Sequence, residues 1–488
     1  MRNAPPLVLY ENIPGKVPVV IYSKIQDKNI NNKLEVIAGL PYIQGPIILL
    51  IDLHNKPSLE TPSSSVVITD HKFSFSLTSP SQNCGMSLIV TPFTKEDISP
   101  IFIEKLMSKI KSEIPLTNQS PILSIEEVYQ ALGQGAEWAV KKFELPGNIL
   151  HHIENRGSLL NSNEFSIPAI DHSIPNEIIE ISQRRFGIIG GGNHFFEIQV
   201  VNEIMNEGIA KEWGLKLNQI VIMFHSGSDA LGAYLGRLYA FRKKTNIRHQ
   251  LQFFKKKIKH HLMHGPWQSI PHRISYYLLP TAFRFIDPET QEGKRALLTI
   301  KCAANFGFAC RIAIFNTISR AIKNISGDIN NGDISLLYDC SHNSIYEETI
   351  NGKVVWAHRH NACQALPASR LKEHPIFSIT GQPVILPGTN QTSSFICAAG
   401  EGVVKTHFTV DHGLGSIQKH YEKYALSKEI EDKVSLFSYE KDGVEKINRF
   451  SDTAVNEAVE TLNRFDIVNT VARLKPLATL KGPKSRIV

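Results

Sequence analysis

Short runs rich in valine, isoleucine and leucine recur along the chain and constrain its fold more than any other feature. They predict β-strands over residues 16–22, 45–53, 65–70, 86–93, 218–227, 333–343 and 383–388. Apolar residues spaced three or four apart predict helices over residues 124–143, 310–325 and 451–466. The fold class is therefore mixed α and β, with a β-sheet core and surrounding helices.

The chain has 488 residues, of which 42% are hydrophobic and 20% are charged. This composition is typical of an ordinary globular protein and excludes a disordered chain. No internal repeat and no long low-complexity linker divides the sequence. We therefore expect a single large catalytic domain over residues 1–488.

Basic residues outnumber acidic ones by 53 to 46, which gives a formal net charge of +7. A mild excess is compatible with an anionic partner such as nucleic acid. A basic helical segment at about residues 240–265 interleaves aromatic and basic side chains, as surfaces that follow a nucleic-acid backbone do. A solvated amphipathic helix explains the same segment equally well.

The six cysteines are spread along the chain without a CxxC pair, which favours a reducing compartment over a disulfide scaffold. The first residues have no apolar segment behind a basic start, so no secretory signal is expected. No uninterrupted apolar stretch is long enough to span a bilayer. We therefore expect a cytoplasmic protein without a membrane partner.

Several predicted strands end in His, Cys or Asp next to glycine or asparagine. Functional side chains often gather on such loops, because a rigid scaffold holds them outside the core. Any one of these histidines alone is more simply explained as a surface residue or a satisfied core residue. Together, a thiolate and imidazoles from separate strands would suit Mn, Fe, Co or Zn, and the set would be Cys84, His194, His225 and His342.

The segment "GIIGGGNHFFEI", residues 187–198, places three glycines directly before an Asn-His pair. It matches neither GxGxxG nor the P-loop, which argues against a Rossmann-type nucleotide loop. A strand from Asn193 onward fits better, and its alternation would put His194 and Phe196 on one face and Asn193, Phe195 and Glu197 on the other. The glycines would allow another backbone or a phosphate to approach closely.

A second glycine-rich segment, "HGLG", begins at His412. The backbone amides of Gly413 and Gly415 would hold anionic oxygens beside the imidazole. Histidine serves as general base, metal ligand or covalent nucleophile, and the local sequence leaves all three roles open.

Taken in order, these motifs resemble those of the RtcB family of RNA-splicing ligases over almost the whole chain. The matching segments are "IDLH", "NCG", "GNHFFE", "HSGS", "SHN", "HRHNA", "PGT", "HGLG" and "VARLKPLATLKG". The resemblance implies an RtcB-like catalytic domain that needs GTP and one or two Mn(II) ions. It implies joining of RNA 3′-phosphate or 2′,3′-cyclic phosphate ends to 5′-hydroxyl ends, and it makes an archease-type activator a candidate partner.

The resemblance also assigns roles to residues. It makes Cys84, His194, His225 and His342 the metal ligands and His412 the histidine that attacks the α-phosphate of GTP and becomes guanylated. Glu197 and Lys481 would contact the edge of guanine, and Phe450 would stack on its ring. Phosphates or the nucleoside would contact Asn193, Asn343, Thr389 and Ser394, and Asp52 would lie near the metals.

Four departures from the family pattern bear on the function. Ser81 stands where the family has a metal-bridging aspartate, and the family's basic residues are replaced at His360, Asp229 and Ser416. Loss of a carboxylate between two cations should weaken the second metal. The main hypothesis is a divergent RNA ligase. The alternatives are a catalytically impaired relative that binds GTP or RNA ends in a regulatory role, and a metal hydrolase without a guanine-reading acid.

Overall fold

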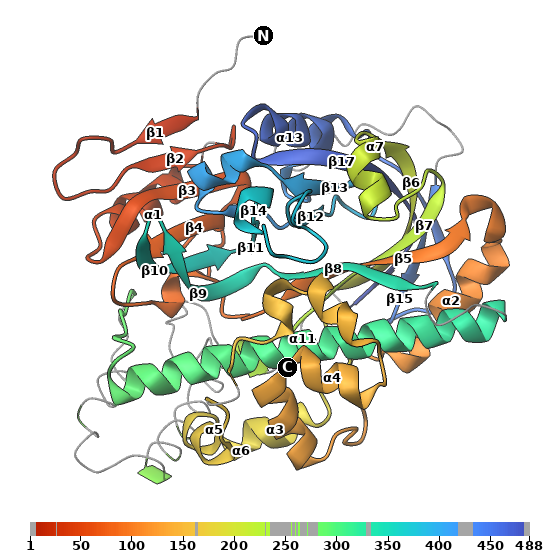
Figure 1. Ribbon diagram of the computed structural model, residues 1–488, viewed down its shortest axis with the longest axis horizontal. Helices are drawn as coiled ribbons and strands as arrows, with labels where there is room; N and C mark the ends of the chain where they lie inside the picture. The colour runs from red at the N-terminus through yellow and green to blue at the C-terminus, as the bar shows by residue number, and fades with distance from the viewer. Residues whose placement is uncertain are drawn as a thin grey trace.

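The computed structural model describes residues 6–25, 27–161, 164–229, 231–234, 282–327, 333–417 and 433–482, together with a few single positions between 255 and 271. It has the mixed α and β fold that the sequence predicts, with a large, strongly curled antiparallel sheet covered by helices (Figure 1). The basic segment at 240–265 lies almost entirely outside the described residues.

A nine-stranded sheet forms the centre of the molecule. Its neighbouring strands are antiparallel except for one parallel pair, between β15 (Lys433–Ser438) and β17 (Val468–Lys481). In spatial order the strands are β12 (Pro383–Leu386), β13 (Ser394–Ala399), β17 (Val468–Lys481), β6 (Phe195–Ile204), β7 (Gln219–Ser226), β5 (Gly85–Thr94) and β8 (Ser335–Ser341), with β15 (Lys433–Ser438) on β17 and β16 (Glu445–Asn448) on β15.

Side chains of this sheet alternate between two apolar cores. In β7, Ile220, Ile222 and Phe224 pack into the core beneath the helices, whereas Val221 and Met223 pack into the core on the other face. A strand with both faces covered reads as a continuous apolar run, because successive side chains point in opposite directions. The run "QIVIMFHS" is therefore a buried central strand, and His225 at its end joins the face of Met223.

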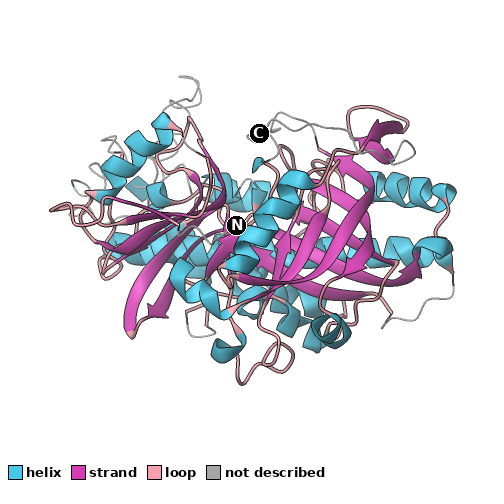
Figure 2. Ribbon diagram, turned by 90° about the horizontal axis from the view of Figure 1, so that it is seen from above, coloured by secondary structure: helices cyan, strands magenta, loops and turns pink. Residues whose placement is uncertain are grey.

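A second, six-stranded sheet lies beside the first (Figure 2). Its order is β1 (Leu7–Leu9), β2 (Val19–Ile21), β3 (Ile43–His54), β4 (Ser63–Thr69), β10 (Lys353–His360) and β9 (Asn343–Ile350). One face packs on α1 (Lys28–Ala38), and the other contributes to a core shared with α13 (Thr453–Arg464) and strands β12 and β13. A two-stranded ribbon of β11 (Ala362–Gln364) and β14 (Thr409–Asp411) completes the β structure among the described residues.

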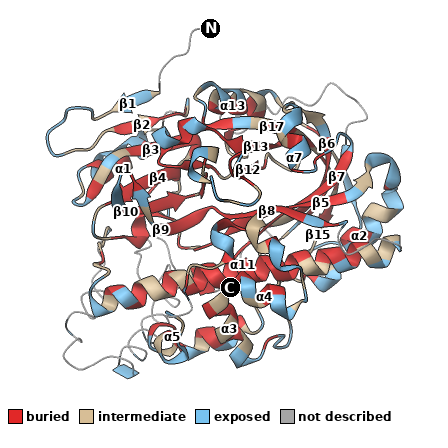
Figure 3. Ribbon diagram, in the orientation of Figure 1, coloured by how far each residue is buried: buried red, intermediate tan, exposed pale blue. Residues whose placement is uncertain are grey.

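Helices from residues 100–182 gather around one long helix, α11 (Gln291–Ser326), which runs beneath the central sheet (Figure 1). The remaining helices are α2 (Pro100–Glu113), α3 (Ile125–Gln134), α4 (Ala136–Lys142), α5 (Ile167–Ser173), α6 (Asn176–Ser182) and α7 (Glu207–Glu212). At 36 residues, α11 is long and apolar enough to cross a membrane, but 83% of its most apolar window is buried in the protein. Figure 3 shows this burial along most of its length, as expected of a core helix.

All the predicted strands are present, and the predicted helices are present with changed ends. The helix predicted over 124–143 is divided in two at Gly135, whose φ of +60° is outside the helical range. The helix predicted over 310–325 is the C-terminal half of the longer α11. The strand predicted from Asn193 begins at Phe195 instead, so the alternation of faces does not extend back to His194.

A fully buried ion pair joins the long helix to the central sheet. Arg311 of α11 donates from Nε and Nη2 to the two carboxylate oxygens of Asp339 in β8, at 2.7 and 2.8 Å. Its remaining donors reach the backbone oxygen and the side-chain oxygen of Asn83, both at 3.0 Å. Gly85 permits this approach, because a Cβ there would lie 2.6 Å from the guanidinium carbon. The guanidinium thus fixes the turn that precedes β5.

We predict that Arg311→Met lowers the free energy of unfolding by about 3–5 kcal/mol, because it leaves the Asp339 carboxylate buried and unpaired. Urea denaturation followed by fluorescence measures this loss. Arg320→Met removes an exposed arginine from the same helix and should change stability by less than about 0.5 kcal/mol. Equal losses in the two variants would contradict a structural role for the buried pair.

Candidate metal and nucleotide site

The candidate site lies where the two sheets meet. His342 stands between the end of β8, in the central sheet, and the start of β9, in the six-stranded sheet. The turn that carries Cys84 is paired with this junction: Asn83 N donates to Asn343 O and His342 N donates to Cys84 O, both at 2.9 Å. Backbone hydrogen bonds therefore set the position of both the cysteine and the histidine.

Cys84, His194 and His225 form the first donor group. The sulfur of Cys84 lies 3.1 Å from His194 Nε2 and 3.0 Å from His225 Nε2. His194 Nδ1 lies 2.6 Å from the carbonyl oxygen of Ile189, and the His225 ring is hydrogen-bonded to the backbone of Asn193. With Nδ1 held as the donor to a carbonyl, Nε2 keeps its lone pair for a metal.

A second donor group, His225, His342 and His412, shares one imidazole with the first. His225 Nε2 lies 2.8 Å from His342 Nε2, and the rings of His342 and His412 are stacked with centroids 3.7 Å apart. Nδ1 of His342 and Nδ1 of His412 are buried without a hydrogen-bond partner among the described residues. Buried polar atoms of this kind are typical of a site completed by a ligand.

The imidazoles of His225, His342 and His412 have lowered pKa values, which favours their neutral forms. Burial, followed by repulsion from neighbouring histidines, holds the pKa of His225 and of His342 well below its usual range. Burial together with Lys56 and His54 lowers the pKa of His412 to about 3. Neutral imidazoles beside a cysteine sulfur are the donors that a borderline divalent transition ion takes, so these residues fit such a metal.

His194 reaches the cluster because the glycines before it allow a tight approach. At Gly190, with φ +77°, a Cβ would lie 2.9 Å from His194 Nδ1. His194 and His225 both contact the Cys84 sulfur. His225 is paired across the sheet with Phe195, which lies on the same face of β6 as Glu197, so His225 lies on that face too. The expectation that His194 and Glu197 point to opposite faces is therefore wrong, because His194 precedes the strand.

Two buried carboxylates hold the loop that follows His412. Asp52 Oδ1 accepts hydrogen bonds from the backbone N–H groups of Ser416 and Ile417, both at 2.8 Å. Asp411 accepts in turn from Ile51 N at 3.1 Å and from Asp52 N at 3.0 Å. Burial, and then the negative charge of Asp411, raises the pKa of Asp52 well above its usual range. The contacts of Asp52 are thus those of a residue that positions the His412 loop.

Glu197 lies at the centre of a buried polar network. Thr479 donates to Oε2 at 2.9 Å, and Gln199 donates to Oε1. Gln199 also donates to Ser394 Oγ at 3.0 Å, which accepts from Gly388 N at the same distance. Burial raises the pKa of Glu197 to about 7. An acid in such surroundings can accept from or donate to a polar ligand near neutral pH.

The loop with the "HGLG" motif packs against the loop with the "PGT" motif. Leu414 N donates to Pro387 O at 2.8 Å, and a Cβ on Gly413 would lie 3.2 Å from the same oxygen. A Cβ on Gly415 would lie 3.5 Å from the oxygen of Gly388. His412 is thereby placed beside the segment that leads through Ser394 to Glu197.

The other residues to which the resemblance assigned nucleotide contacts lie around this segment. Thr389 is braced by Thr392 Oγ1, which lies 3.1 Å from its hydroxyl oxygen. Phe450 N donates to Gln391 O at 2.8 Å, and Lys481 Nζ donates to Asn390 Oδ1 at 3.1 Å. Asn343 accepts from Asn361 N at 2.9 Å, and Asn193 is exposed. The residues that the resemblance assigns to the metal and to the nucleotide therefore lie next to one another.

The substituted positions have defined places. Ser81 belongs to the turn of the first donor group, since Cys84 N donates to Ser81 O at 3.2 Å. Asp229 pairs with Arg185 at 3.3 Å, so an arginine from another segment accompanies the acid. Burial, followed by repulsion from Lys56 and His54, lowers the pKa of His360 to about 3. Its side chain is therefore neutral at a position where the resemblance implies a lysine.

Some residues around the site were not identified from the sequence. Gln199 and Thr479 hold Glu197, Arg311 and Asp339 hold the Asn83 turn, and Lys56 is a cation near His412. The arginine could have been noticed, because it interrupts an otherwise apolar helical stretch. Thr479 carries no local signal, since it meets Glu197 through strand pairing. Gln199 lies two residues from Glu197 on β6, but its link to Ser394 depends on a distant strand.

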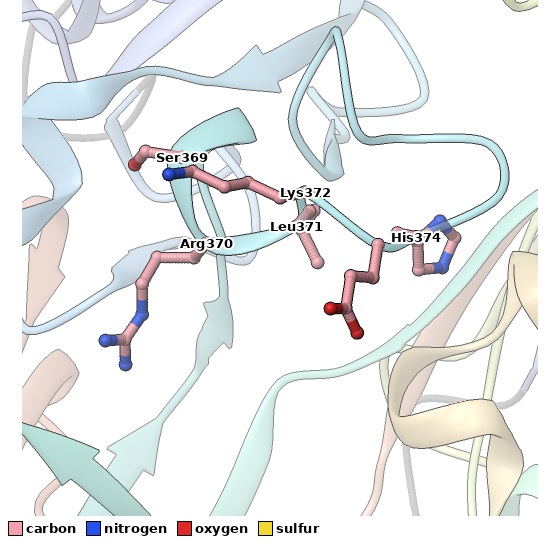
Figure 4. Close-up of a pocket in the computed structure, with 6 residues that line it drawn as sticks. Ser369, Arg370, Leu371, Lys372 and His374 are labelled. Carbon is pink, nitrogen blue, oxygen red and sulfur yellow. The ribbon is translucent and has the colours of Figure 1, made fainter.

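A surface cavity of about 560 Å³ lies over residues 369–374. Its walls come from one segment, and the side chains of Arg370, Lys372 and His374 point in different directions (Figure 4). Arg370 is already engaged, because it donates to Thr349 O at 2.8 Å and lies over the ring of Phe408. The cavity therefore differs from the metal site, where side chains from several strands converge.

Cysteine and histidine side chains converge from several strands at a sheet junction, next to a buried acid network, and together form a candidate metal site. The family model described as tRNA-splicing ligase RtcB matches residues 33–482. The chain therefore belongs to the RtcB family.

Individual relatives agree with this membership. The tRNA-splicing ligase RtcB of Thermococcus kodakarensis is 27% identical over 82% of this chain and 80% of its own length. That of Aeropyrum pernix is 27% identical over 96% of this chain and 95% of its own length. That of Pyrobaculum aerophilum is 26% identical over 82% of this chain and 80% of its own length. The similarity thus covers most of each protein at low identity.

We predict that Glu197→Gln makes stability less dependent on pH. The folded protein holds the Glu197 proton up to about pH 7 whereas the unfolded chain loses it near 4.5, so this group lowers stability as pH rises through that window. Between pH 4.5 and 7, the free energy of unfolding should fall by up to about 3 kcal/mol less in the variant than in wild type. Denaturation at a series of pH values measures this difference. Glu212→Gln, an exposed control, should follow wild type. Parallel curves for wild type and Glu197→Gln would contradict the raised pKa.

Proposed function

We propose that this chain is a divergent RNA ligase that uses GTP and Mn(II) to join RNA 3′-phosphate or 2′,3′-cyclic phosphate ends to 5′-hydroxyl ends. The observation that carries the proposal is the position of His412. Its neutral ring is stacked on His342 of the donor cluster, and its loop packs against the segment that leads to Glu197. A nucleophilic histidine beside a metal site and a base-reading acid is the arrangement that guanylate transfer needs.

In the proposed first step, the neutral imidazole of His412 attacks the α-phosphorus of GTP. A nitrogen–phosphorus bond forms, the bond to the β-phosphate oxygen breaks, and pyrophosphate leaves. The GMP group then passes to the RNA 3′-phosphate, and the 5′-hydroxyl displaces GMP to form the phosphodiester. Bound Mn(II) would neutralise phosphate oxygens, with Cys84, His194, His225 and His342 as its protein ligands.

The remaining site residues would orient the substrates. Asp52 would hold the His412 loop through the amides of Ser416 and Ile417. Glu197 would pair with the N–H groups of guanine, with Lys481 at the same base and Phe450 stacked on it. Thr389, Ser394 and the amides of the "HGLG" loop would contact the nucleoside and its phosphates. An archease-type protein is the candidate activator.

A regulatory relative that binds GTP or RNA ends without ligation is the second candidate. It is favoured by the substituted positions, where Ser81 offers no carboxylate, His360 is neutral and Asp229 is acidic. These changes lower the positive charge and the number of hard oxygen ligands available to a triphosphate and two metals. The two candidates differ in whether His412 becomes covalently modified.

We expect purified protein incubated with α-labelled GTP and Mn(II) to carry a label that survives a denaturing gel. A histidine phosphoramidate is labile in acid and stable in alkali, and His412→Ala should abolish it. His71→Ala, which removes an exposed histidine, is the matched control and should retain the label. Absence of label in wild type with Mn, Co, Zn and Mg would refute the ligase proposal at its first step and favour the regulatory candidate.

We also predict that Ser81→Asp strengthens Mn(II) binding by about tenfold or more, because it restores a carboxylate to the turn that holds Cys84. Isothermal titration calorimetry measures the affinity, and the rate of GMP labelling should rise with it. Ser79→Asp adds the same charge two residues away and should have a smaller effect. Unchanged affinity in Ser81→Asp would show that position 81 does not face the metals.

A further inference from the structure

A cavity of about 380 Å³ lies between α13 and the end of β6, away from the metal cluster. Its floor includes Phe395 and Arg473, which are paired across β13 and β17. Phe395 directly follows Ser394, whose side chain belongs to the Glu197 network, so the cavity opens on the opposite face of the sheet. One side of α13 forms the wall, with residues at helical spacing: Asn456, Val459, Glu460 and Asn463.

Two polar atoms in this lining are buried without a hydrogen-bond partner among the described residues, namely Asn456 Oδ1 and Arg473 Nε. One is an acceptor and the other is a donor. The neighbouring carboxamide of Asn463 is satisfied, because it donates to Thr470 Oγ1 at 2.6 Å and accepts from Thr470 N at 3.1 Å. Buried orphan groups are uncommon, so this pair indicates a ligand that offers a donor and an acceptor together.

The charge and shape of the cavity limit the kind of ligand. Arg473 is paired with Glu203 at 3.0 Å, and Glu460 adds a further negative charge, so the site does not favour a phosphate. The guanidinium of Arg473 lies over the ring of Phe395, with 5.6 Å between its central carbon and the ring centroid. This contact holds the guanidinium plane, so Nε–H donates in one direction, to a group that lies in that plane.

The backbone beneath the cavity is irregular. The register of β13 and β17 shifts between Ile396 and Cys397, which leaves Val471 as an extra residue. The carbonyl of Val471 accepts from Met205 N at 2.8 Å and from Asn206 N at 3.2 Å, where β6 ends. Bulges are common next to binding sites, because they redirect side chains and interrupt strand pairing.

We propose that this cavity binds an unpaired nucleobase of the RNA substrate, which forms hydrogen bonds through its edge to Asn456 Oδ1 and Arg473 Nε. The RNA assignment rests on the proposed function. Nucleobase edges present a donor and an acceptor side by side, and carboxamide and guanidinium groups commonly form hydrogen bonds to the edges of bases. The site lies outside the catalytic cluster and therefore adds affinity without taking part in guanylate transfer.

The test uses full-length protein and a fluorescent single-stranded RNA of about 12 nucleotides, a length within the usual range of single-strand sites. The RNA carries a 5′-phosphate and a 3′-hydroxyl, so it cannot be ligated by the proposed reaction. Fluorescence anisotropy is compared for wild type, Asn456→Leu and Arg473→Met, with Arg464→Met as an exposed control on the same helix that does not line the cavity. Thermal denaturation and GMP labelling of His412 verify that each variant is folded and retains the proposed chemistry.

We expect Asn456→Leu and Arg473→Met to weaken RNA binding by about fivefold or more and Arg464→Met to leave it unchanged. An abasic RNA of equal length should bind the variants and wild type equally. The slope of affinity against salt should not change in Arg473→Met, because its charge is already paired with Glu203.

If GMP labelling is intact, equal RNA affinity in wild type and both cavity variants would overturn the cavity inference but not the proposed ligase function. Saturable binding of a free nucleoside that needs Asn456, with RNA affinity unaltered, would overturn the RNA assignment. Absence of labelling in wild type would instead refute the proposed ligase function, and absence of RNA binding in wild type would overturn the inference itself.

Discussion

The buried ion pair between Arg311 and Asp339 is the interaction on which the site depends. It connects the long core helix to the central sheet, and the same guanidinium binds the main chain and side chain of Asn83. The turn held in this way carries Cys84, whose sulfur is shared by His194 and His225. A buried arginine with all its donors directed at fixed acceptors allows little movement of that turn. The geometry of the candidate donor cluster is thus set by a residue that has no direct contact with the donor atoms.

The second constraint is the junction of the two sheets. His342 occupies the single position between β8 and β9, and its ring stacks on His412. His412 is held from the opposite side, because Asp52 in β3 binds the amides that follow it. The nucleophile proposed here therefore lies between elements from both sheets. This arrangement explains how the chain retains the cluster although Ser81, Asp229 and His360 differ from the family pattern. The backbone, rather than these side chains, supports the site.

Much of the fold was predictable because its signals are local. Apolar runs such as "QIVIMFHS" identified the strands, and the α13 pattern identified a helix within about two residues of its observed ends. The errors arose where tertiary structure overrides the pattern. Gly135 interrupts a helix that the spacing predicted to be continuous, and His194 lies outside a strand that was predicted to include it. Thr479 was missed because it meets Glu197 only after β6 and β17 pair, and Gln199 because the burial that makes its bond to Glu197 important is a tertiary property.

The sequence alone determined the fold class, the order of the motifs and the family resemblance, because residue type and periodicity are properties of short segments. Through the resemblance it also indicated positions, such as Ser81, at which the chain departs from the family pattern. Only the tertiary structure decided which donors meet, since Cys84, His194, His225 and His342 come from four segments joined by non-local strand pairs. It also decided protonation, because burial, which no local pattern measures, keeps His412 neutral and raises the pKa of Glu197 to about 7.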